Sequence, residues 1–402
     1  MKVSHILKQD FHSIYPQVHK TRLSTLCTFV ESGIKDQIVS VTYLGRGLSS
    51  DSKTTKKHDI KRADRITGNP LLHSERHLFY QYMARRLIGD ELTPIILVDW
   101  SPLNGQKIFQ LLRASIPMGG RSLTLYEKTF PESELNTHKA HKDFLDELEM
   151  ILPDGCQPII ITDAIYRSPW FCAVEAKNWY WLGRVRGRVS LSQDELNWRT
   201  SYDMFKVASV GKIDSLGTVF YGKKAKFECK GVLYKRASKG RSIKKMRGGT
   251  SQRTTDKIYE KDAKEPWLLI FKLPERYKDD EKLVVALYRQ RMQIEENFRD
   301  TKNGKLGISL EYANSKTPKR FDNLLLIAAL ILFIIWCVGR AAIMKKLHYS
   351  LQANSVKTRA VLSIIYIGRE VIKDERYKIL IEDFVSVLSS LSTFPINIER
   401  LQ

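Results

Sequence analysis

Residues 288–302 read YRQRMQIEENFRDTK, a stretch rich in helix-forming residues. The segment from residue 281 to residue 303 contains neither Pro nor Gly, which predicts one continuous helix. Because successive helical residues lie about 100° apart, four apolar side chains fall within one narrow sector. We interpret this sector as the core-facing side of the helix: Leu283, Leu287, Ile294 and Phe298.

A second sector, next to the first, carries four polar side chains: Tyr288, Arg291, Glu295 and Lys302. An ordinary solvated face with an i,i+4 Arg–Glu pair would explain this pattern and would contribute only a few tenths of a kcal/mol. A functional surface along one side of a packed helix would explain it as well. Of the two neighbouring acids, helical phase favours Glu295, since Glu296 lies about 100° away.

The composition is that of a basic, globular protein of two or three domains. The 402 residues are 43% hydrophobic and 10% aromatic, which excludes a disordered chain. Lys and Arg number 66 against 44 Asp and Glu, giving a net charge of +22. This excess favours a polyanionic partner, most commonly nucleic acid, although ribosomal and membrane-surface proteins are basic too.

Cysteine usage and hydropathy indicate a cytoplasmic protein. The five cysteines are scattered and form no Cys-x2-Cys pair, so neither a disulfide framework nor a structural zinc site is expected. No signal-peptide pattern opens the chain. Residues 324–339 are apolar and uncharged, but crossing a bilayer takes about 20 such residues. We therefore predict a fully buried helix and no membrane association.

Residues 1–90 are predicted to form a helical, basic domain that binds DNA. Gly45 separates short apolar segments, and the basic stretch from about residue 54 can be helical until Gly68. This arrangement is similar to a helix-turn-helix unit, with a solvated surface helix beside a loop as the alternative. The residues predicted to contact DNA here are Lys57, Lys61, Arg62 and Arg65.

From residue 93 the sequence changes to short apolar runs that are typical of buried strands. Residues 94–98 and 158–162 read as central strands covered on both faces, and each run ends on a carboxylate, Asp99 or Asp163. The other elements predicted in this region are a hairpin over 107–126, helices over 139–152 and 169–177, and a strand over 179–186.

The resulting order is three strands, a helix, a strand, a helix and a strand, which is that of a ribonuclease-H-like α/β core. Ligand and metal sites in open α/β sheets commonly gather at strand ends. An Asp after a strand can also simply cap the following turn, and for Asp99 or Asp163 alone that alternative stays open.

The core is predicted to be interrupted by a β insertion. A flexible loop within it, at 235–257, carries nine Lys or Arg residues against one Asp and would suit phosphate binding. The predicted organisation after the N-terminal domain is therefore the first part of the core at 91–188, the β insertion at 189–272, the rest of the core at 273–318 and a helical C-terminal region at 319–402.

Three acids stand out for chemistry: Asp99, Asp163 and Glu295. Hard oxygen ligands bind Mg²⁺, and two such ions about 3.5–4 Å apart suit phosphodiester chemistry on nucleic acid. One ion would activate the attacking water or 3′-hydroxyl, and the other would stabilise the leaving oxygen. We expect Asp99 to bridge both ions, the other two acids to bind one each, and Mn²⁺ to be able to replace Mg²⁺.

The 288–302 stretch resembles a known family. Its four polar residues, in the pattern Y-x2-R-x3-E-x6-K, are similar to the Y-R-E-K signature of bacterial insertion-sequence DDE transposases. The surrounding residues look close to the cut-and-paste, hairpin-forming branch. Other segments resemble that branch too, so that the resemblance covers nearly the whole chain: LVDW at 97–100, TDA at 162–164, the basic stretch at 56–69 and KEPW at 264–267.

This resemblance implies a role for each matched residue. Asp99, Asp163 and Glu295 would form the DDE triad. The residues that would hold the phosphates of the transposon end are Tyr288, Arg291 and Lys302. Trp267 would stack on a base flipped out of the duplex, and Met292 would wedge into the vacated stack. Core packing is the alternative for both of these side chains.

The implied reaction is cut-and-paste transposition in four metal-dependent steps. Water nicks one strand, the freed 3′-hydroxyl forms a hairpin, water reopens it, and the 3′-hydroxyl attacks target DNA. The implied partners are terminal inverted repeats and target DNA, bound by a homodimer that pairs two ends. Two alternatives stay open: a ribonuclease-H-like nuclease or resolvase without strand transfer, and an inactive DNA-binding regulator.

Overall fold

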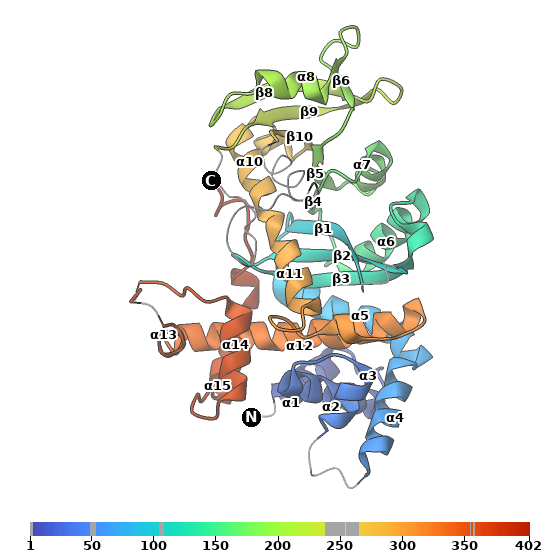
Figure 1. Ribbon diagram of the computed structural model, residues 1–402, viewed down its shortest axis with the longest axis vertical. Coiled ribbons are helices and arrows are strands. Elements are labelled where there is room, and N and C mark those ends of the chain that lie inside the picture. Colours follow the sequence, from blue (N-terminus) through green and yellow to red (C-terminus); the bar gives the residue numbers. More distant parts are fainter. Residues whose placement is uncertain are drawn as a thin grey trace. The chain divides into compact units, whose positions relative to one another are not determined.

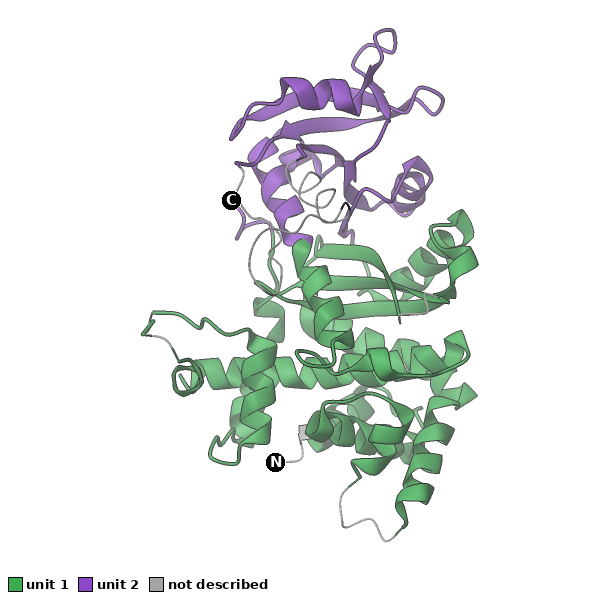
Figure 2. Cartoon of the chain, viewed as in Figure 1, with its two compact units in different colours: residues 1–156, 292–397 green, residues 157–291, 398–402 purple. Residues whose placement is uncertain are grey.

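The structure, a computed structural model, describes residues 3–48, 54–103, 108–237, 254, 265–353, 355–356 and 358–402. The chain is of the mixed α/β class and divides into two compact units (Figure 2). Unit 1 comprises residues 1–156 and 292–397, and unit 2 comprises residues 157–291 and 398–402. The predicted basic loop at 235–257 lies almost entirely outside the described residues, and its role stays a prediction.

Unit 1 combines three antiparallel strands with helices from both halves of the chain (Figure 1). The strands follow the order β3-β2-β1 and are β1 (Ile95–Pro102), β2 (Phe109–Pro117) and β3 (Ser122–Pro131). The helices are α1 (Val3–Ile14), α2 (Lys20–Asp36), α3 (Val41–Arg46), α4 (Lys56–Thr67), α5 (Pro70–Ile88), α6 (His138–Ile151), α11 (Met292–Lys302), α12 (Pro318–Met344), α13 (His348–Leu351), α14 (Ile364–Lys373) and α15 (Ile381–Ser389).

The predicted hairpin is confirmed as β2 and β3, which pair antiparallel. Gly119 and Gly120 form its turn with φ angles of 79° and 93°, a region that glycine adopts without strain. The prediction that the first strand ends at Asp99 is wrong. Strand β1 continues to Pro102, because Trp100, Ser101 and Pro102 pair with residues 112, 111 and 110 in the first half of β2. Asp99 therefore lies inside the strand, opposite Arg113.

Helix α12 forms the centre of the helical part of unit 1. Its hydropathy and length would allow it to cross a membrane, but 89% of its most apolar window is buried inside the protein. It packs against α2, α5, α14, α15 and strand β3. The predicted buried helix at 324–339 is thus confirmed as the middle of a longer helix.

Helices α3 and α4 pack closely against one another in the N-terminal region. Sequence analysis placed Gly45 between apolar segments, as in a turn, but it lies within α3. A Cβ atom at this position would lie 2.4 Å from Cα of Ile60, so glycine is required by the close approach of α4. The predicted helix from residue 54 to Gly68 is confirmed as α4.

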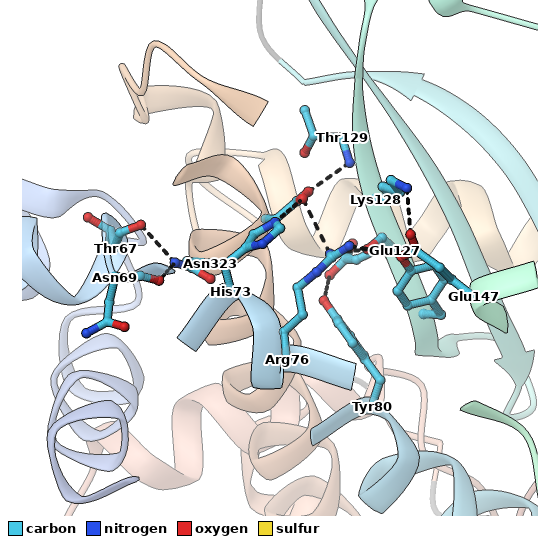
Figure 3. A network of polar contacts seen from close by, with 12 residues as sticks. Thr67, Asn69, His73, Arg76, Tyr80, Glu127, Lys128, Thr129, Glu147 and Asn323 are labelled. Carbon is cyan, nitrogen blue, oxygen red and sulfur yellow. Dashed lines mark hydrogen bonds and ion pairs between the residues drawn. The ribbon is translucent and has the colours of Figure 1, made fainter. Parts of the chain in front are cut away.

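A polar network connects α5, β3, α6 and α12 (Figure 3). Asp322 on α12 contacts Nε2 of His73 at 3.1 Å and accepts a hydrogen bond from the backbone N–H of Thr129 at 2.8 Å. Arg76 on α5 donates to the Glu127 carbonyl at 3.1 Å and forms an ion pair with Asp322. Because Asp322 and Arg76 are almost fully buried, these contacts compensate for lost hydration and fix α5 and α12 against β3.

Unit 2 contains seven strands, which follow one another in the order β4-β5-β10-β9-β8-β6-β7. Strands β4 and β5 are parallel and are connected through α7, as expected for a crossover connection. The elements are β4 (Ile159–Thr162), α7 (Ser168–Glu175), β5 (Tyr180–Val185), β6 (Ser190–Ser192), β7 (Arg199–Thr200), α8 (Ser201–Val207), β8 (Ile213–Tyr221), β9 (Phe227–Tyr234), β10 (Trp267–Lys272) and α10 (Glu281–Gln290).

The predicted continuous helix over 281–303 is wrong, since the structure divides it into α10 and α11 at Arg291. The Arg291 N–H bonds the carbonyl of Tyr288, three residues back, which tightens the turn and ends α10. Tertiary contacts fix the beginning of α11: Gln293 accepts hydrogen bonds from the Met118 N–H and the Ser122 hydroxyl. The predicted core face is confirmed, because Leu283, Leu287, Ile294 and Phe298 are all buried.

Candidate active site

Asp99 lies in the fifth position of β1, between buried apolar residues on either side along the strand. Its side chain is half-buried, and its Oδ1 accepts a hydrogen bond from the Trp100 N–H at 2.8 Å. Residues that pair across antiparallel strands project to the same face of the sheet. Asp99 therefore shares a face with Arg113 of β2, which in turn pairs with Glu127 of β3.

Helix α11 packs on all three strands of unit 1 (Figure 1) and carries three of the predicted site residues, Met292, Glu295 and Lys302. Glu295 lies in its first turn and is exposed, while Lys302 is its last residue. The Lys302 ammonium donates to the Ser101 hydroxyl and, at 3.0 Å, to the Pro102 carbonyl. These acceptors follow Asp99 along β1, so α11 ends beside the part of the strand that carries this acid.

Burial and, to a smaller extent, the Arg113 guanidinium lower the pKa of Lys302 to about 8, against the opposing effects of the Asp99 and Glu311 carboxylates. The protonated form of a buried amine is stabilised by any additional anion nearby. A DNA phosphate near Lys302 would therefore be stabilised by the ammonium and would in turn stabilise its protonated form.

The neighbouring acid Glu296 is engaged elsewhere. Its Oε2 lies 3.0 Å from Nη1 of Arg121, and its other oxygen contacts Arg299. Both oxygens of Glu296 therefore hold guanidinium groups. Helical phase along one continuous helix predicted Glu295 rather than Glu296 as the site acid, and the structure divides that helix. Within α11 alone, Glu295 and Lys302 are seven residues apart and still share a side.

In unit 2, Asp163 directly follows strand β4, as the sequence predicted. Its Oδ1 accepts a hydrogen bond from the Ile165 N–H at 2.8 Å. This is the turn-capping role that sequence analysis held as an alternative, and it occupies one of the two carboxylate oxygens.

The first half of the signature gathers with Trp267 inside unit 2. Tyr288 is 4% exposed and its ring meets that of Trp267 edge-on, with centroids 4.9 Å apart. Tyr234 contacts Trp267 from another side at 5.8 Å. Trp267 is half-buried in this aromatic cluster, whereas Met292, at the beginning of α11, is 52% exposed.

Guanidinium groups gather near Arg291 in the same unit. Arg184 and Arg186 both contact Glu265, with Arg184 Nη2 at 3.1 Å from Oε2. Burial lowers the pKa of Arg184, and the nearby charges of Arg186 and Arg291 lower it further. The Glu265 carboxylate thus contacts two of these guanidinium groups.

The basic residues predicted on α4 lie at or near its surface. Lys57, Lys61 and Arg65 are exposed, and Arg62 is half-buried with an ion pair to Asp59 at 3.4 Å. Helix α4 therefore presents several cations to solvent along its outer side, as contact with a phosphate backbone requires.

The proposed metal ligands are divided between the two units: Asp99 and Glu295 belong to unit 1, and Asp163 belongs to unit 2. Within the part of the chain that the structure describes, no group of three His, Cys, Asp or Glu side chains is close enough to hold a metal ion. The donor chemistry nevertheless fits Mg²⁺, because the predicted set consists of carboxylates and contains neither thiolate nor imidazole.

Sequence analysis missed four buried residues that hold α11 to the sheet. Arg113 and Glu127 are charged residues inside apolar strands, and Asn297 and Thr301 are polar residues on the buried side of the helix. A charged residue within a buried strand is rare unless it is paired, so Arg113 and Glu127 were detectable in the sequence as unusual. Their pairing with each other depends on the strand register, which the sequence alone did not provide.

The sequence model of the family described as "Transposase DDE domain" matches residues 90–334, more than half of the chain. The match includes every predicted catalytic and phosphate-binding residue between Asp99 and Lys302, whereas the basic residues of α4 precede it. A comparison with curated proteins found no match.

Proposed function

Because the chain belongs to the family of transposase DDE domains, we propose that it is a cut-and-paste transposase of the hairpin-forming branch with the Y-R-E-K signature. The observation that carries this proposal is the attachment of α11 to β1. Lys302 bonds to Ser101 and Pro102, next to Asp99, while Glu295 lies on the same side of α11 as Lys302. The two acids Asp99 and Glu295 and the proposed phosphate-binding cation Lys302 thereby belong to a strand and a helix that pack against each other.

We infer that the catalytic core is ribonuclease-H-like. In unit 1 this is supported by the antiparallel β1-β2-β3 arrangement followed by α6, and in unit 2 by the parallel β4 and β5 connected through α7. Asp163 of unit 2 completes the triad with Asp99 and Glu295 in this proposal. The predicted domains, including the helical DNA-binding region at 1–90 and the C-terminal region at 319–402, belong to the same proposal.

Members of this family generally use divalent metal ions, and Asp99, Asp163 and Glu295 would hold two Mg²⁺ ions here. Such ions supply activation of the attacking oxygen and stabilisation of the leaving oxygen. The protein's own cations hold the DNA: Arg291 and Lys302 bind phosphates, and Tyr288 supports them. Trp267 stacks on the flipped base, and Met292, exposed at the beginning of α11, enters the gap that the base leaves.

The reaction consists of four in-line displacements at phosphorus. Water cleaves one strand, the released 3′-hydroxyl attacks the opposite strand to form a hairpin, and water reopens the hairpin. The same 3′-hydroxyl then attacks target DNA. We propose that two transposon ends are held by a homodimer, that the protein acts in the bacterial cytoplasm at the nucleoid, and that α12 is a core helix without a membrane role.

A strand-transfer assay tests this function. Purified protein is incubated with Mg²⁺, a DNA fragment bearing the terminal inverted repeat and a supercoiled target plasmid, and products are separated on denaturing gels. Transposition predicts nicked, hairpin and joined products in that order. A nuclease without strand transfer would cleave the fragment and never join it to the plasmid. An inactive regulator would bind the fragment and give no products, with or without Glu295→Ala.

A further inference from the structure

We infer that Arg113, held by Glu127, is a positioning residue that fixes α11 so that Glu295 and Lys302 take their places beside Asp99. This inference rests on the proposed function, since it concerns the same site. It goes beyond the triad and the signature because neither Arg113 nor Glu127 belongs to them. Both residues lie in unit 1 with α11.

A row of three charged residues crosses the sheet of unit 1. The strand register pairs Asp99 with Arg113 and Arg113 with Glu127. All three side chains project to one face, because paired residues in neighbouring antiparallel strands do so. Along this row exposure falls from a half-buried Asp99 to Arg113 at 1% and Glu127 at 0%. The site acid thus stands at the accessible end of a row whose other members are buried.

The guanidinium of Arg113 has partners on two sides. Toward the sheet, its Nε donates to Oε2 of Glu127 at 2.7 Å and its Nη2 lies 2.5 Å from the same oxygen. Toward the helix, its Nη1 donates to Oδ1 of Asn297 at 2.5 Å and to Oγ1 of Thr301 at 2.9 Å. A planar group with fixed donor directions therefore specifies both the distance and the rotation of α11.

The two residues that Arg113 holds flank the functional positions of the helix. Asn297 follows Glu295 by two residues, and Thr301 directly precedes Lys302. Asn297 also donates to the Ser122 carbonyl at 2.9 Å, which adds a second anchor on β3. A shift of α11 would therefore move Glu295 and Lys302 together, relative to an Asp99 that stays in the sheet.

The carboxylate of Glu127 is itself held in place. Tyr80 donates to its Oε1 at 3.3 Å, and Arg76 donates to its backbone carbonyl, as Figure 3 shows. Replacing a buried ion pair by apolar residues of similar volume is often tolerated by the fold, whereas removing one partner leaves a buried charge. Stability alone therefore does not require this pair, but the orientation of α11 does.

The test uses the full chain with a double variant, Arg113→Met with Glu127→Leu, which keeps the volume and removes both charges. We expect it to melt cooperatively and to bind inverted-repeat DNA within about twofold of wild type. Its rate of strand nicking at saturating Mg²⁺ should fall about 100-fold, as expected for a misplacement of about 1 Å. The Mg²⁺ concentration for half-maximal nicking should rise about 10-fold, as for loss of a group that orients a metal ligand.

Two single variants complete the design. Thr301→Val removes one hydrogen bond from the guanidinium without leaving a buried charge and should shift the Mg²⁺ requirement in the same direction by a smaller factor. Arg113→Lys keeps the charge without the planar fork and should remain impaired. Arg86→Lys, whose ion pair with Asp10 joins α5 to α1, serves as the matched control and should nick normally.

Normal nicking and normal Mg²⁺ dependence in a folded double variant would overturn the inference. If the double variant does not fold, wild-type Mg²⁺ dependence in Thr301→Val would overturn it equally. Failure of the proposed function itself is distinguishable, because wild-type protein would then show no metal-dependent nicking at all.

Discussion

Individual side chains on α11 divide into two groups with different tasks. Asn297 and Thr301 are buried and bind Arg113, while Glu295 is exposed and Lys302 reaches the backbone of β1. This division follows from helical geometry, in which residues three or four positions apart share a side. The side that carries Asn297 and Thr301 fixes the helix against the sheet.

The pair Glu295 and Glu296 offers a matched test of the catalytic assignment. Changing Glu295 to Gln should reduce nicking by about 1000-fold or more, because several kcal/mol of metal-dependent stabilisation is lost. Glu296→Gln, which removes the same charge from the next position, should reduce nicking less than about 10-fold, since Glu296 holds Arg121 and Arg299. Rates on a pre-cut and an uncut end fragment provide the measurement. Equal losses in the two variants would reject Glu295 as the site acid.

Asp300 predicts a pH dependence of stability. Burial raises its pKa to about 6, against the opposing charge of Arg121 2.8 Å away. The folded state therefore binds the Asp300 proton more tightly than the unfolded state, whose pKa is about 3.9. This contribution is fully present below pH 4 and is lost as the pH rises through 6.

The variant Asp300→Asn lacks this titration. Relative to wild type, its free energy of unfolding should increase between pH 4 and pH 7 by about 3 kcal/mol, at roughly 1.4 kcal/mol per pKa unit. Urea unfolding of both proteins across this range gives the difference directly. A constant difference would show that Asp300 does not titrate in this window.

Single elements show where sequence patterns were sufficient. Apolar runs predicted the positions of β1, β4 and β5, because strands buried on both faces leave a continuous hydrophobic signal. The break between α10 and α11 left no such signal. It arises from tertiary contacts of Gln293 with the β2–β3 hairpin, and no Pro or Gly marks it.

Helix α4 makes a prediction about DNA affinity. Changing Lys61 or Arg65 to Ala should weaken binding to all sequences and should reduce the slope of log affinity against log salt concentration by about 1 each. Lys142→Ala on α6, whose side chain is 65% exposed, is the control and should leave the slope unchanged. Fluorescence anisotropy at several salt concentrations measures the slopes. Unchanged slopes in the α4 variants would remove this helix from the DNA interface.

The crossing of α12 and α14 makes a prediction about stability. A Cβ at Gly339 would lie 2.2 Å from the Ile364 carbonyl oxygen, so Gly339→Ala must force the helices apart. Overpacking of this kind costs about 1–3 kcal/mol. The control Met344→Ala, at a position of α12 that is 52% exposed, should change stability by less than about 0.5 kcal/mol. Thermal unfolding of both variants distinguishes a close helix crossing from a loose one.

At the scale of the whole molecule, the signature helix pair spans the two units: Tyr288 and Arg291 belong to unit 2, and Glu295 and Lys302 belong to unit 1. Sequence patterns predicted most helices and strands, because these depend on local hydrophobic periodicity. They also predicted the candidate acids, because two of these follow apolar runs and the third lies on the polar side of a helix. They could not predict the Arg113–Glu127 pair, which depends on strand register, or the interior position of Asp99 in β1.

The central claim is that Asp99, Asp163 and Glu295 are the three catalytic acids of the proposed transposase. The most direct measurement is Mg²⁺-dependent nicking by three variants, Asp99→Asn, Asp163→Asn and Glu295→Gln. Binding of each variant to inverted-repeat DNA is measured in parallel, and Asp203→Asn, at an exposed position of unit 2, is the control. We predict that all three variants bind DNA normally and lose nicking by about 1000-fold or more, while the control nicks at the wild-type rate. Wild-type nicking by Asp163→Asn would contradict the claim, since the proposed triad requires the carboxylate of Asp163.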